Sequence, residues 1–408
     1  MRALKDQMKK MNPFISTKTL SISLVGPEDD SAPRLWRIRT PKASKQGQPR
    51  KEITKISDSK LRSMYEVEGQ VMESIHPGAE VILGRRLSSN EEVVVKTRDK
   101  SASFHGPADE REWRETTTTQ LNMPKIENMC EYIAVYETRD KYYIVMERVK
   151  GMDLFEHLKQ GQIRQEDARQ ILFQMLQALE EMHACGRIHK DLKLENVVVN
   201  LPSPRMCSVS SNGFTTSAQV KLIDFDTAQD WETTSPKAKV VVGTAGYIAP
   251  EAYSGDYSPA SDNYGVGVIM YKLLTGRFPT RREIFDSLPG ENWVGSPAMK
   301  RIQDRLTSER VDFTQPPLDQ LPDARDLVKK LLASDASERP SAAGALRHPW
   351  FQHADSRRHG SRSASSKSTT AGSSSASHGE CRESSSSWIT VPQWHSEAES
   401  TSLPGELA

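Results

Sequence analysis

Two groups of polar side chains lie beside short apolar runs and could do chemistry together. Asp191, Lys193 and Asn196 come just before the apolar run Val197–Val199, and Asp224 directly follows another such run. Carboxylate and amide oxygens are hard ligands that suit Mg²⁺, which keeps several of its own waters. An isolated Asp-x-Lys, by contrast, is most often a surface ion pair. The residue types allow a metal-dependent site, and the neighbouring residues must decide between these readings.

A further charged residue, Lys96, closes the apolar strand predicted at residues 93–95. An amine at the end of an apolar strand is costly to bury unless a carboxylate pairs with it. We therefore expect a carboxylate on a facing helix.

Three motifs occur in a fixed order along the chain. They are His189–Asn196 (HKDLKLEN), the triplet Asp224–Asp226 (DFD) and Gly243–Glu251 (GTAGYIAPE). Together they resemble the eukaryotic protein kinases, with a variant HRDxxxxN catalytic loop, a variant DFG and an intact APE. One triplet alone would be weak, but three in order are specific. The resemblance covers about residues 65–352, and Asp335, Arg339 and the sequence at 348–351 resemble the calcium/calmodulin-dependent group of Ser/Thr kinases.

This resemblance implies transfer of the γ-phosphoryl group of ATP, with Mg²⁺, to Ser or Thr of a protein substrate. Asp191 would orient the acceptor hydroxyl and take its proton, while Asn196 and Asp224 would hold Mg²⁺. Lys193 would neutralise the γ-phosphate, and Thr244 would brace Lys193 and Asp191.

In the same family a strand lysine grips the α- and β-phosphates, and Lys96 matches it. Its partner on the family's helix αC would be Glu115, with Glu112 one turn earlier as the alternative. The run Thr116–Thr119 follows, and β-branched residues are poor helix formers, at roughly half a kcal/mol each against Ala. We expect a frayed helix whose order depends on nucleotide or on an activating partner.

The remaining nucleotide contacts also come from the resemblance. Ser74, Gly78 and Val81 fall in the loop that covers the phosphates, Met146 is the gatekeeper, Glu147 and Val149 offer backbone groups to adenine, and Asp153 lies near the ribose and the substrate entry.

Two departures from the family pattern bear on activity. The phosphate loop keeps only Gly78 and Val81 of the expected pattern, so we expect weakened ATP affinity. Asp226 stands where the triplet normally ends in Gly; it could help hold metal, raise the proton affinity of Asp224, or stiffen a conformational switch. Both departures favour an alternative, a pseudokinase scaffold with weak or no catalysis. The enzyme is favoured because all four residues matched to phosphate binding, proton transfer and metal binding remain: Lys96, Asp191, Asn196 and Asp224.

Regulation and substrate choice leave weaker traces. Lys190 replaces the arginine that usually binds an activation-loop phosphate, and the position that typically carries the phosphate falls near Val240. We expect activity independent of a phosphate there, with Thr233–Ser235 as other acceptors. Asp153 and Glu195 favour a basic residue before the target Ser or Thr, although Lys272 weakens this inference. Structural roles are implied for Glu251 with Arg339, as a buried ion pair, and for Asp262, as a cap on catalytic-loop amides.

The elements that must position these residues change in type along the chain. Antiparallel strands are predicted first, and helical spacing takes over between Ala168 and Met182. This pattern predicts an α+β, two-lobed kinase-like fold. The predicted parts are a basic disordered extension (1–62), a kinase domain (63–352; N-lobe 63–148, C-lobe 149–352) with an exposed hairpin insertion at about 201–219, and a Ser-rich disordered tail (353–408).

Composition excludes several other classes of protein. Lys and Arg number 55 against 54 Asp and Glu, so no nucleic-acid partner is expected. The 4 cysteines are widely spaced, which argues against a disulfide framework or a zinc site. No apolar run is long enough for a transmembrane segment, and no secretory signal is evident at the N-terminus. We expect a cytoplasmic or nuclear location.

Overall fold

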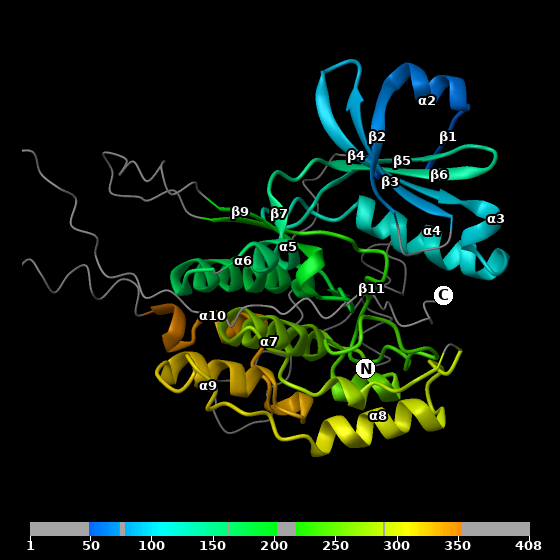
Figure 1. The fold of residues 1–408 in the computed structure, drawn as a ribbon. Helices are drawn as coiled ribbons and strands as arrows, with labels where there is room; N and C mark the ends of the chain where they lie inside the picture. The colour runs from blue at the N-terminus through cyan, green and yellow to red at the C-terminus, as the bar shows by residue number, and fades with distance from the viewer. Residues whose placement is uncertain (1–48, 74–77, 162, 202–217, 289, 353–408) are drawn as a thin grey trace, which may run out of the picture. The chain divides into compact units, whose positions relative to one another are not determined.

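A computed structural model describes residues 49–73, 78–161, 163–201, 218–288 and 290–352. The predicted Ser-rich tail, residues 1–48 of the predicted extension, and Ser74 lie outside these described residues. The fold class is confirmed as α+β, with a sheet-based N-lobe above a mainly helical C-lobe in Figure 1.

The N-lobe is built on one six-stranded sheet in the order β1-β5-β6-β4-β3-β2. Strands β2 to β4 form an antiparallel meander, as expected, and the apolar alternation in β4 buries Val93 and Val95 on one face. The strands are β1 (Thr54–Lys55), β2 (Tyr65–Glu73), β3 (Ala79–Arg86), β4 (Glu91–Asp99), β5 (Tyr132–Glu137) and β6 (Lys141–Glu147).

Residues 49–62 correct the predicted boundary of the extension, because they fold onto the N-lobe. Strand β1 pairs in parallel with β5, and helix α2 (Asp58–Met64) begins at Ser57, whose hydroxyl accepts a hydrogen bond from the Lys60 amide. Ile56, Leu61 and Met64 pack against the outer face of the sheet. The basic composition of the whole extension masked this apolar spacing, so the prediction of disorder is wrong from residue 49 onward.

Two helices lie beside the sheet, α3 (Lys100–Ser103) and α4 (Pro107–Leu121). Helix α4 continues through the threonine run, in contrast to the predicted fraying. The hydroxyls of Thr118 and Thr119 donate to the carbonyls of Arg114 and Glu115, one turn back, and Thr117 is buried. Such back-bonding and tertiary packing satisfy β-branched residues that propensity alone disfavours.

The segment 49–57 also clamps the end of α4. The Asn122 side chain accepts a hydrogen bond from the Lys51 amide and donates one to the Lys51 carbonyl, both at 2.8 Å. The same amide group donates to the Thr118 carbonyl at 2.8 Å. This reciprocal contact ties the start of the described chain to the helix that faces the candidate site.

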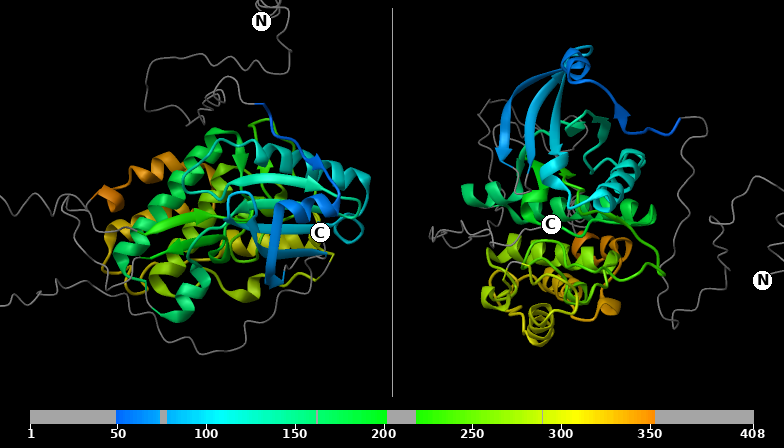
Figure 2. Two further views of the ribbon diagram at one scale, coloured as in Figure 1. Left: turned by 90° about the horizontal axis from the view of Figure 1, so that it is seen from above. Right: turned by 90° about the vertical axis from the view of Figure 1, so that its right-hand side faces the viewer.

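The C-lobe is organised around helix α7 (Pro259–Thr275), whose residues are all buried. The middle of this helix is apolar on every side, as expected for a helix inside a protein, and α7 packs against both α6 (Gln165–Ala184) and α9 (Pro322–Leu331). Helix α6 buries the predicted stripe that includes Ala168 and Met182. The remaining helices are α5 (Leu154–Gln160), α8 (Pro297–Ser308) and α10 (Ala342–Leu346). The right-hand view of Figure 2 shows the yellow and orange helices of the C-lobe on the side away from the blue strands of the N-lobe.

Short strands carry the polar loops between the helices. Strand β9 (Val197–Asn200) pairs with β10 (Gln219–Leu222) and with β7 (Met152–Asp153), and β8 (Arg187–Ile188) pairs with β11 (Gln229–Asp230). The β9–β10 pairing makes the predicted insertion a hairpin connection, of which residues 202–217 lie outside the described part of the chain. None of the helices in the described ranges is both long and apolar enough to cross a bilayer.

Candidate active site

The catalytic loop brings three of the predicted residues into direct contact. The Thr244 hydroxyl donates to Asp191 Oδ1 at 2.7 Å and accepts from Lys193 Nζ at 3.0 Å. Lys193 Nζ also lies 3.2 Å from Asp191 Oδ2. Burial alone would lower the pKa of Lys193, but the charge and hydrogen bond of Asp191, together with the charges of Glu195 and Asp224, raise it above the ordinary value. The triad therefore holds a charged lysine beside a carboxylate.

Asp262, in the first turn of α7, fixes the loop that carries Asp191 and Lys193. Its two carboxylate oxygens accept the backbone amides of His189 and Lys190 at 2.8 and 2.9 Å. The carboxylate also contacts His183 Nε2 at 2.8 Å. Burial opposes ionisation of Asp262, yet these hydrogen bonds and the two histidines lower its pKa. The expected cap on the catalytic-loop amides is confirmed.

The two predicted metal ligands come from adjoining loops. The Ile223 amide donates to the Asn196 carbonyl at 3.0 Å. This bond joins the two loops, because Asp224 directly follows Ile223. The Asn196 amide nitrogen donates to the Asp191 carbonyl at 2.8 Å, so its side-chain oxygen is directed away from that contact. Asp224 adopts a left-handed backbone with φ of 60°. One carboxylate and one amide oxygen form a donor set that suits Mg²⁺.

Lys96 lies on β4 and reaches this second loop. Its Nζ is 2.9 Å from Asp224 Oδ1 and 2.7 Å from Asp226 Oδ2. Burial alone would lower the pKa of this amine, but the charges and hydrogen bonds of the two aspartates raise it above the ordinary value. The amine is therefore charged and already paired. The expected partner Glu115, and its alternative Glu112, are exposed on α4, so the predicted Lys96–Glu115 pair is not formed in this structure.

Phe225, between the two aspartates, anchors the loop in the core. It is 2% exposed and packs against His189 and Tyr132, with ring centroids 5.2 and 6.2 Å away. The Thr227 hydroxyl donates to the His189 carbonyl at 2.9 Å. The aspartates are thus fixed relative to the catalytic loop.

The residues predicted to lie beside adenine are at the end of β6, where Met146 and Glu147 lie, and just after it, at Val149. Met146 is buried in the main core, and the Glu147 carbonyl accepts a weak hydrogen bond from the Cys130 thiol at 3.7 Å. The Glu147 side chain pairs with Lys221 at 2.7 Å. Among the described residues the Val149 amide has no hydrogen-bond partner, so it is an available donor for the edge of a nucleobase.

Three other predicted nucleotide contacts have structural roles as well. Gly78 has φ of 70°, and a Cβ there would lie 2.7 Å from the Ala102 side chain, so this glycine permits close packing of the β2–β3 connection on α3. Val81 is half-buried on β3 and pairs in register with Lys96. Asp153 is the N-cap of α5 and accepts the Glu156 amide at 2.9 Å.

Residues 77–351 match the family described as the protein kinase domain. The chain belongs to the protein kinase family. CDPK-related kinase 5 of Arabidopsis thaliana is 32% identical over 55% of this chain and 33% of that protein. CDPK-related kinase 1 of the same plant is 29% identical over 71% of this chain and 46% of its own length.

A third relative is the CaM kinase-like vesicle-associated protein of Xenopus laevis, 30% identical over 60% of this chain and 61% of that protein. The chain therefore spans less than half the length of the two plant relatives that it matches. These names place the kinase domain near the Ser/Thr kinases of the calcium/calmodulin-dependent group.

In this kinase the activation segment, the stretch between the triplet Asp224–Asp226 and Glu251, is held by main-chain contacts. The Val241 amide donates to the Asn292 carbonyl at 2.7 Å, and the Val294 amide donates to the Lys239 carbonyl at 2.8 Å. Tyr257 adds a side-chain contact, because its hydroxyl donates to the Val242 carbonyl and accepts from the Val242 amide. Lys190, where family members often carry a phosphate-binding arginine, donates instead to the neutral Gln229 side chain at 3.0 Å.

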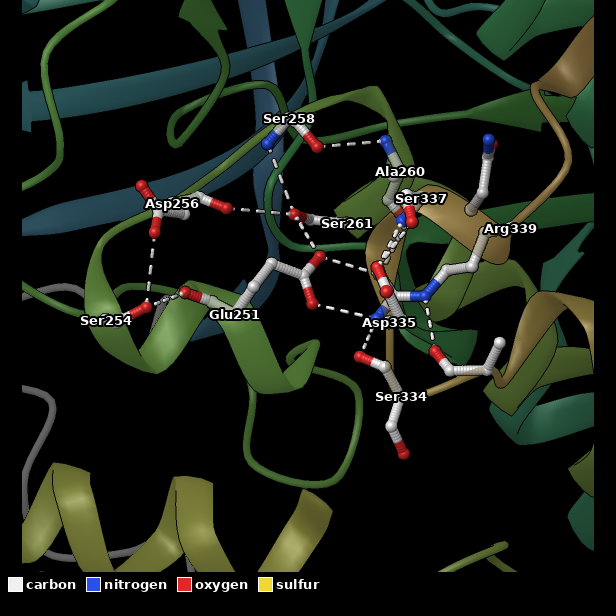
Figure 3. Close-up of polar contacts among 12 residues, drawn as sticks. Glu251, Ser254, Asp256, Ser258, Ala260, Ser261, Ser334, Asp335, Ser337 and Arg339 are labelled. Carbon is white, nitrogen blue, oxygen red and sulfur yellow. Dashed lines mark hydrogen bonds and ion pairs between the residues drawn. The ribbon is translucent and has the colours of Figure 1, made fainter. Parts of the chain in front are cut away.

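The end of the activation segment is locked to the C-lobe by the predicted ion pair. Arg339 donates to both carboxylate oxygens of Glu251, at 2.6 and 2.8 Å (Figure 3). Its guanidinium also donates to the carbonyls of Ala333, Ala260 and Ser334. Every strong donor direction of a buried arginine is used, which is the condition for such a pair to be tolerated.

Sequence reasoning missed three contributors to the site. Asp226 was given three alternative roles, at the metal, on the proton affinity of Asp224 or in a conformational switch, but its contact with Lys96 was not predicted. Arg98, two residues after Lys96, also approaches Asp226, at 3.9 Å. Trp113, rather than a glutamate, is buried on the face of α4 that meets the sheet. The buried spacing Trp113, Thr117, Gln120 and Leu121 is the signal that could have placed Glu115 on the outer face.

Proposed function

We propose that this protein transfers the γ-phosphoryl group of ATP to Ser or Thr hydroxyls of protein substrates. The observation that carries this proposal is the mutual contact of Asp191, Lys193 and Thr244, joined through Asn196 to the loop of Asp224. A structural ion pair alone would not require a half-buried threonine bridge and an adjoining pair of hard oxygen ligands. Family membership supports the same reaction.

The chain's own residues have distinct parts in this reaction. Asp191 accepts the proton of the substrate hydroxyl and orients its oxygen, and Thr244 keeps Asp191 and Lys193 in register. Lys193 and Lys96 offset the negative charge of the phosphates, and Val149 donates its amide to adenine. Asn196 and Asp224 would hold Mg²⁺, which neutralises the triphosphate when bound.

One unpaired acceptor supports a proposal about substrate preference. Glu195 Oε2 is buried and has no hydrogen-bond partner among the described residues. We propose that a basic residue on the N-terminal side of the target Ser or Thr pairs with it. Asp153 supports this less well than expected, because helix α5 already uses one of its oxygens. Lys272 is buried with its amine 3.6 Å from the centre of the Phe278 ring, so its charge is turned toward that ring.

The test is a radiolabelled ATP assay on generic basic protein substrates with the full chain. Wild type should label the substrate, and Asp191→Ala should lose activity by roughly a thousandfold or more, as for loss of a catalytic acid–base group and its positioning. Asp109→Asn, an exposed change on α4, is the matched control. Equal background labelling by wild type and Asp191→Ala would favour the pseudokinase scaffold, the function that the altered phosphate loop supports.

A peptide series tests the substrate preference. Peptides with Arg at successive positions before Ser should have a lower KM than Ala-substituted peptides for wild type, and this difference should shrink in Glu195→Gln. An unchanged difference would place the selecting acidic group elsewhere.

A further inference from the structure

On helix α4, the side chain that faces β4, the strand that carries Lys96, is the aromatic ring of Trp113. Trp113 is 7% exposed and packs against Tyr142 of β6, with ring centroids 4.6 Å apart. The Arg98 guanidinium of β4 lies 5.5 Å from the centre of the Trp113 ring. Because one residue of a helix points toward a given surface spot at each turn, Trp113 occupies the position from which a helix carboxylate would reach β4.

Asp226 supplies the missing carboxylate from the opposite side. Its side chain is 9% exposed and lies between two cations of β4, with Oδ2 2.7 Å from Lys96 Nζ and 3.9 Å from Arg98 Nη1. Lys96 and Arg98 are two residues apart on a strand, so both point to the same face of the sheet. A buried carboxylate between two cations is tolerated because each charge offsets part of the desolvation of the others, and removing the carboxylate would leave the cations without that compensation.

The backbone at Asp226 accepts a side chain without strain. Positive φ among described non-glycine residues occurs at Asn90, Lys190 and Asp224, and Asp226 is not among them. The flexibility that glycine would bring is therefore not needed for this loop conformation. An aspartate at position 226 is therefore compatible with this loop conformation.

We propose that Asp226 is the positioning residue for Lys96, in place of a carboxylate on α4. Trp113 occupies the face of α4 from which a carboxylate would reach β4, and Asp226 presents a carboxylate to Lys96 from the metal-binding loop. Lys96 is thereby held by the same loop that carries Asp224, so its placement does not depend on the position of α4. This inference rests on the proposed phosphoryl transfer, but its central contact can be tested without it.

The first experiment measures nucleotide affinity and kinetics of Asp226 variants. Removing a charged hydrogen-bond partner costs about 1.5–3 kcal/mol, so Asp226→Asn and Asp226→Gly should lose about ten- to a hundredfold in kcat/KM for ATP and in ATP affinity. Asp226→Glu, which keeps the carboxylate, should retain most of both. If glycine merely repaired a damaged motif, Asp226→Gly would be more active than wild type, and that result would overturn the proposal.

A second experiment moves the carboxylate back to the helix. Trp113→Glu combined with Asp226→Gly should recover at least part of the lost ATP affinity, whereas Trp113→Gln with Asp226→Gly should not. Thermal unfolding of each variant shows whether it is folded, and where the double variants are not, the comparison of Asp226→Glu with Asp226→Asn decides. Glu115→Gln should cost far less than Asp226→Asn; equal losses would return the anchor to α4.

A third readout needs neither nucleotide nor catalysis. Acetylation of lysines by a small amine-reactive ester, followed by mass spectrometry, reports the accessibility of Lys96 relative to Lys100, which pairs with Glu137 at 2.8 Å. Asp226→Asn should speed acetylation of Lys96 and leave Lys100 unchanged. If wild type transferred no phosphate but Lys96 behaved in this way, the proposed function would fall and the positioning role would stand. Unchanged acetylation and affinity would overturn the positioning role.

Discussion

Lys190 makes the stability of this kinase depend on pH in a direction opposite to that of an ordinary ion pair. Its amine is enclosed by Gln229 and by the Tyr257 ring, whose centre is 4.4 Å away. Burial lowers the pKa of Lys190 from 10.5 to about 8, although the charges of Asp262 and Glu112 act the other way. The folded protein therefore holds the charged form of this lysine at a cost.

The magnitude follows from the proton affinities of the two states. Each tenfold change in proton affinity corresponds to about 1.4 kcal/mol, so the charged amine costs on the order of 3 kcal/mol, an upper bound because solvent reaches part of the side chain. Below about pH 8 both states are protonated and the whole cost is present. Between about pH 8 and pH 10.5 the unfolded chain binds more protons at Lys190, so the free energy of unfolding rises with pH.

Lys190→Met tests this reasoning by urea denaturation over the same pH range. The variant should be more stable than wild type near pH 7, and the difference should shrink as pH rises toward 10.5. Comparison with the variant cancels other groups that titrate there, and Lys159→Met, which removes an exposed lysine, controls for the loss of one positive charge. A difference in the free energy of unfolding between Lys190→Met and wild type that stays constant from pH 7 to pH 10.5 would refute the reasoning.

Two further predictions concern stability. Arg339→Met should lower the free energy of unfolding by about 3 kcal/mol, because it leaves the partly buried Glu251 carboxylate without a cation and with only the Ser261 hydroxyl as donor. The double variant with Glu251→Met should recover much of this loss in thermal denaturation, and additive losses would argue against a coupled pair. Asn122→Ala should cost about 1–2 kcal/mol and speed amide hydrogen exchange at residues 51–56, whereas Lys51→Ala should be nearly neutral because the clamp uses only the Lys51 backbone; equal effects of the two changes would count against the clamp.

The residues of the catalytic loop were predicted from the family resemblance, and the short spacing of Asp191, Lys193 and Asn196 keeps them on one loop. Thr244, also predicted from the resemblance, reaches them by a contact between distant parts of the chain. The strands and the buried stripe of α6 followed from periodicity of two and of about 3.6 residues. These features depend on local pattern, and the fold preserves them.

The partner of Lys96 was not predictable from spacing alone. Counting residues to Glu115 fixes a distance along the chain but not the rotation of the helix, and rotation is set by which side chain the sheet buries. Trp113 is the only large apolar side chain in α4 before Leu121, and its burial turns Glu115 to solvent. Likewise, the average composition of residues 1–62 did not indicate that the apolar residues between Ile53 and Met64 would pack against the sheet of the N-lobe.

The way the activation segment is fastened has a consequence for how this part of the sequence can vary. Its bonds to Asn292 and Val294 use peptide groups, while the side chains of Val240 and Trp293 extend into solvent at 43% and 52% exposure. Side-chain replacements at those two positions leave the fastening intact, so drift there is tolerated. Proline at 241 or 294 is the exception, since it lacks the hydrogen that each bond requires.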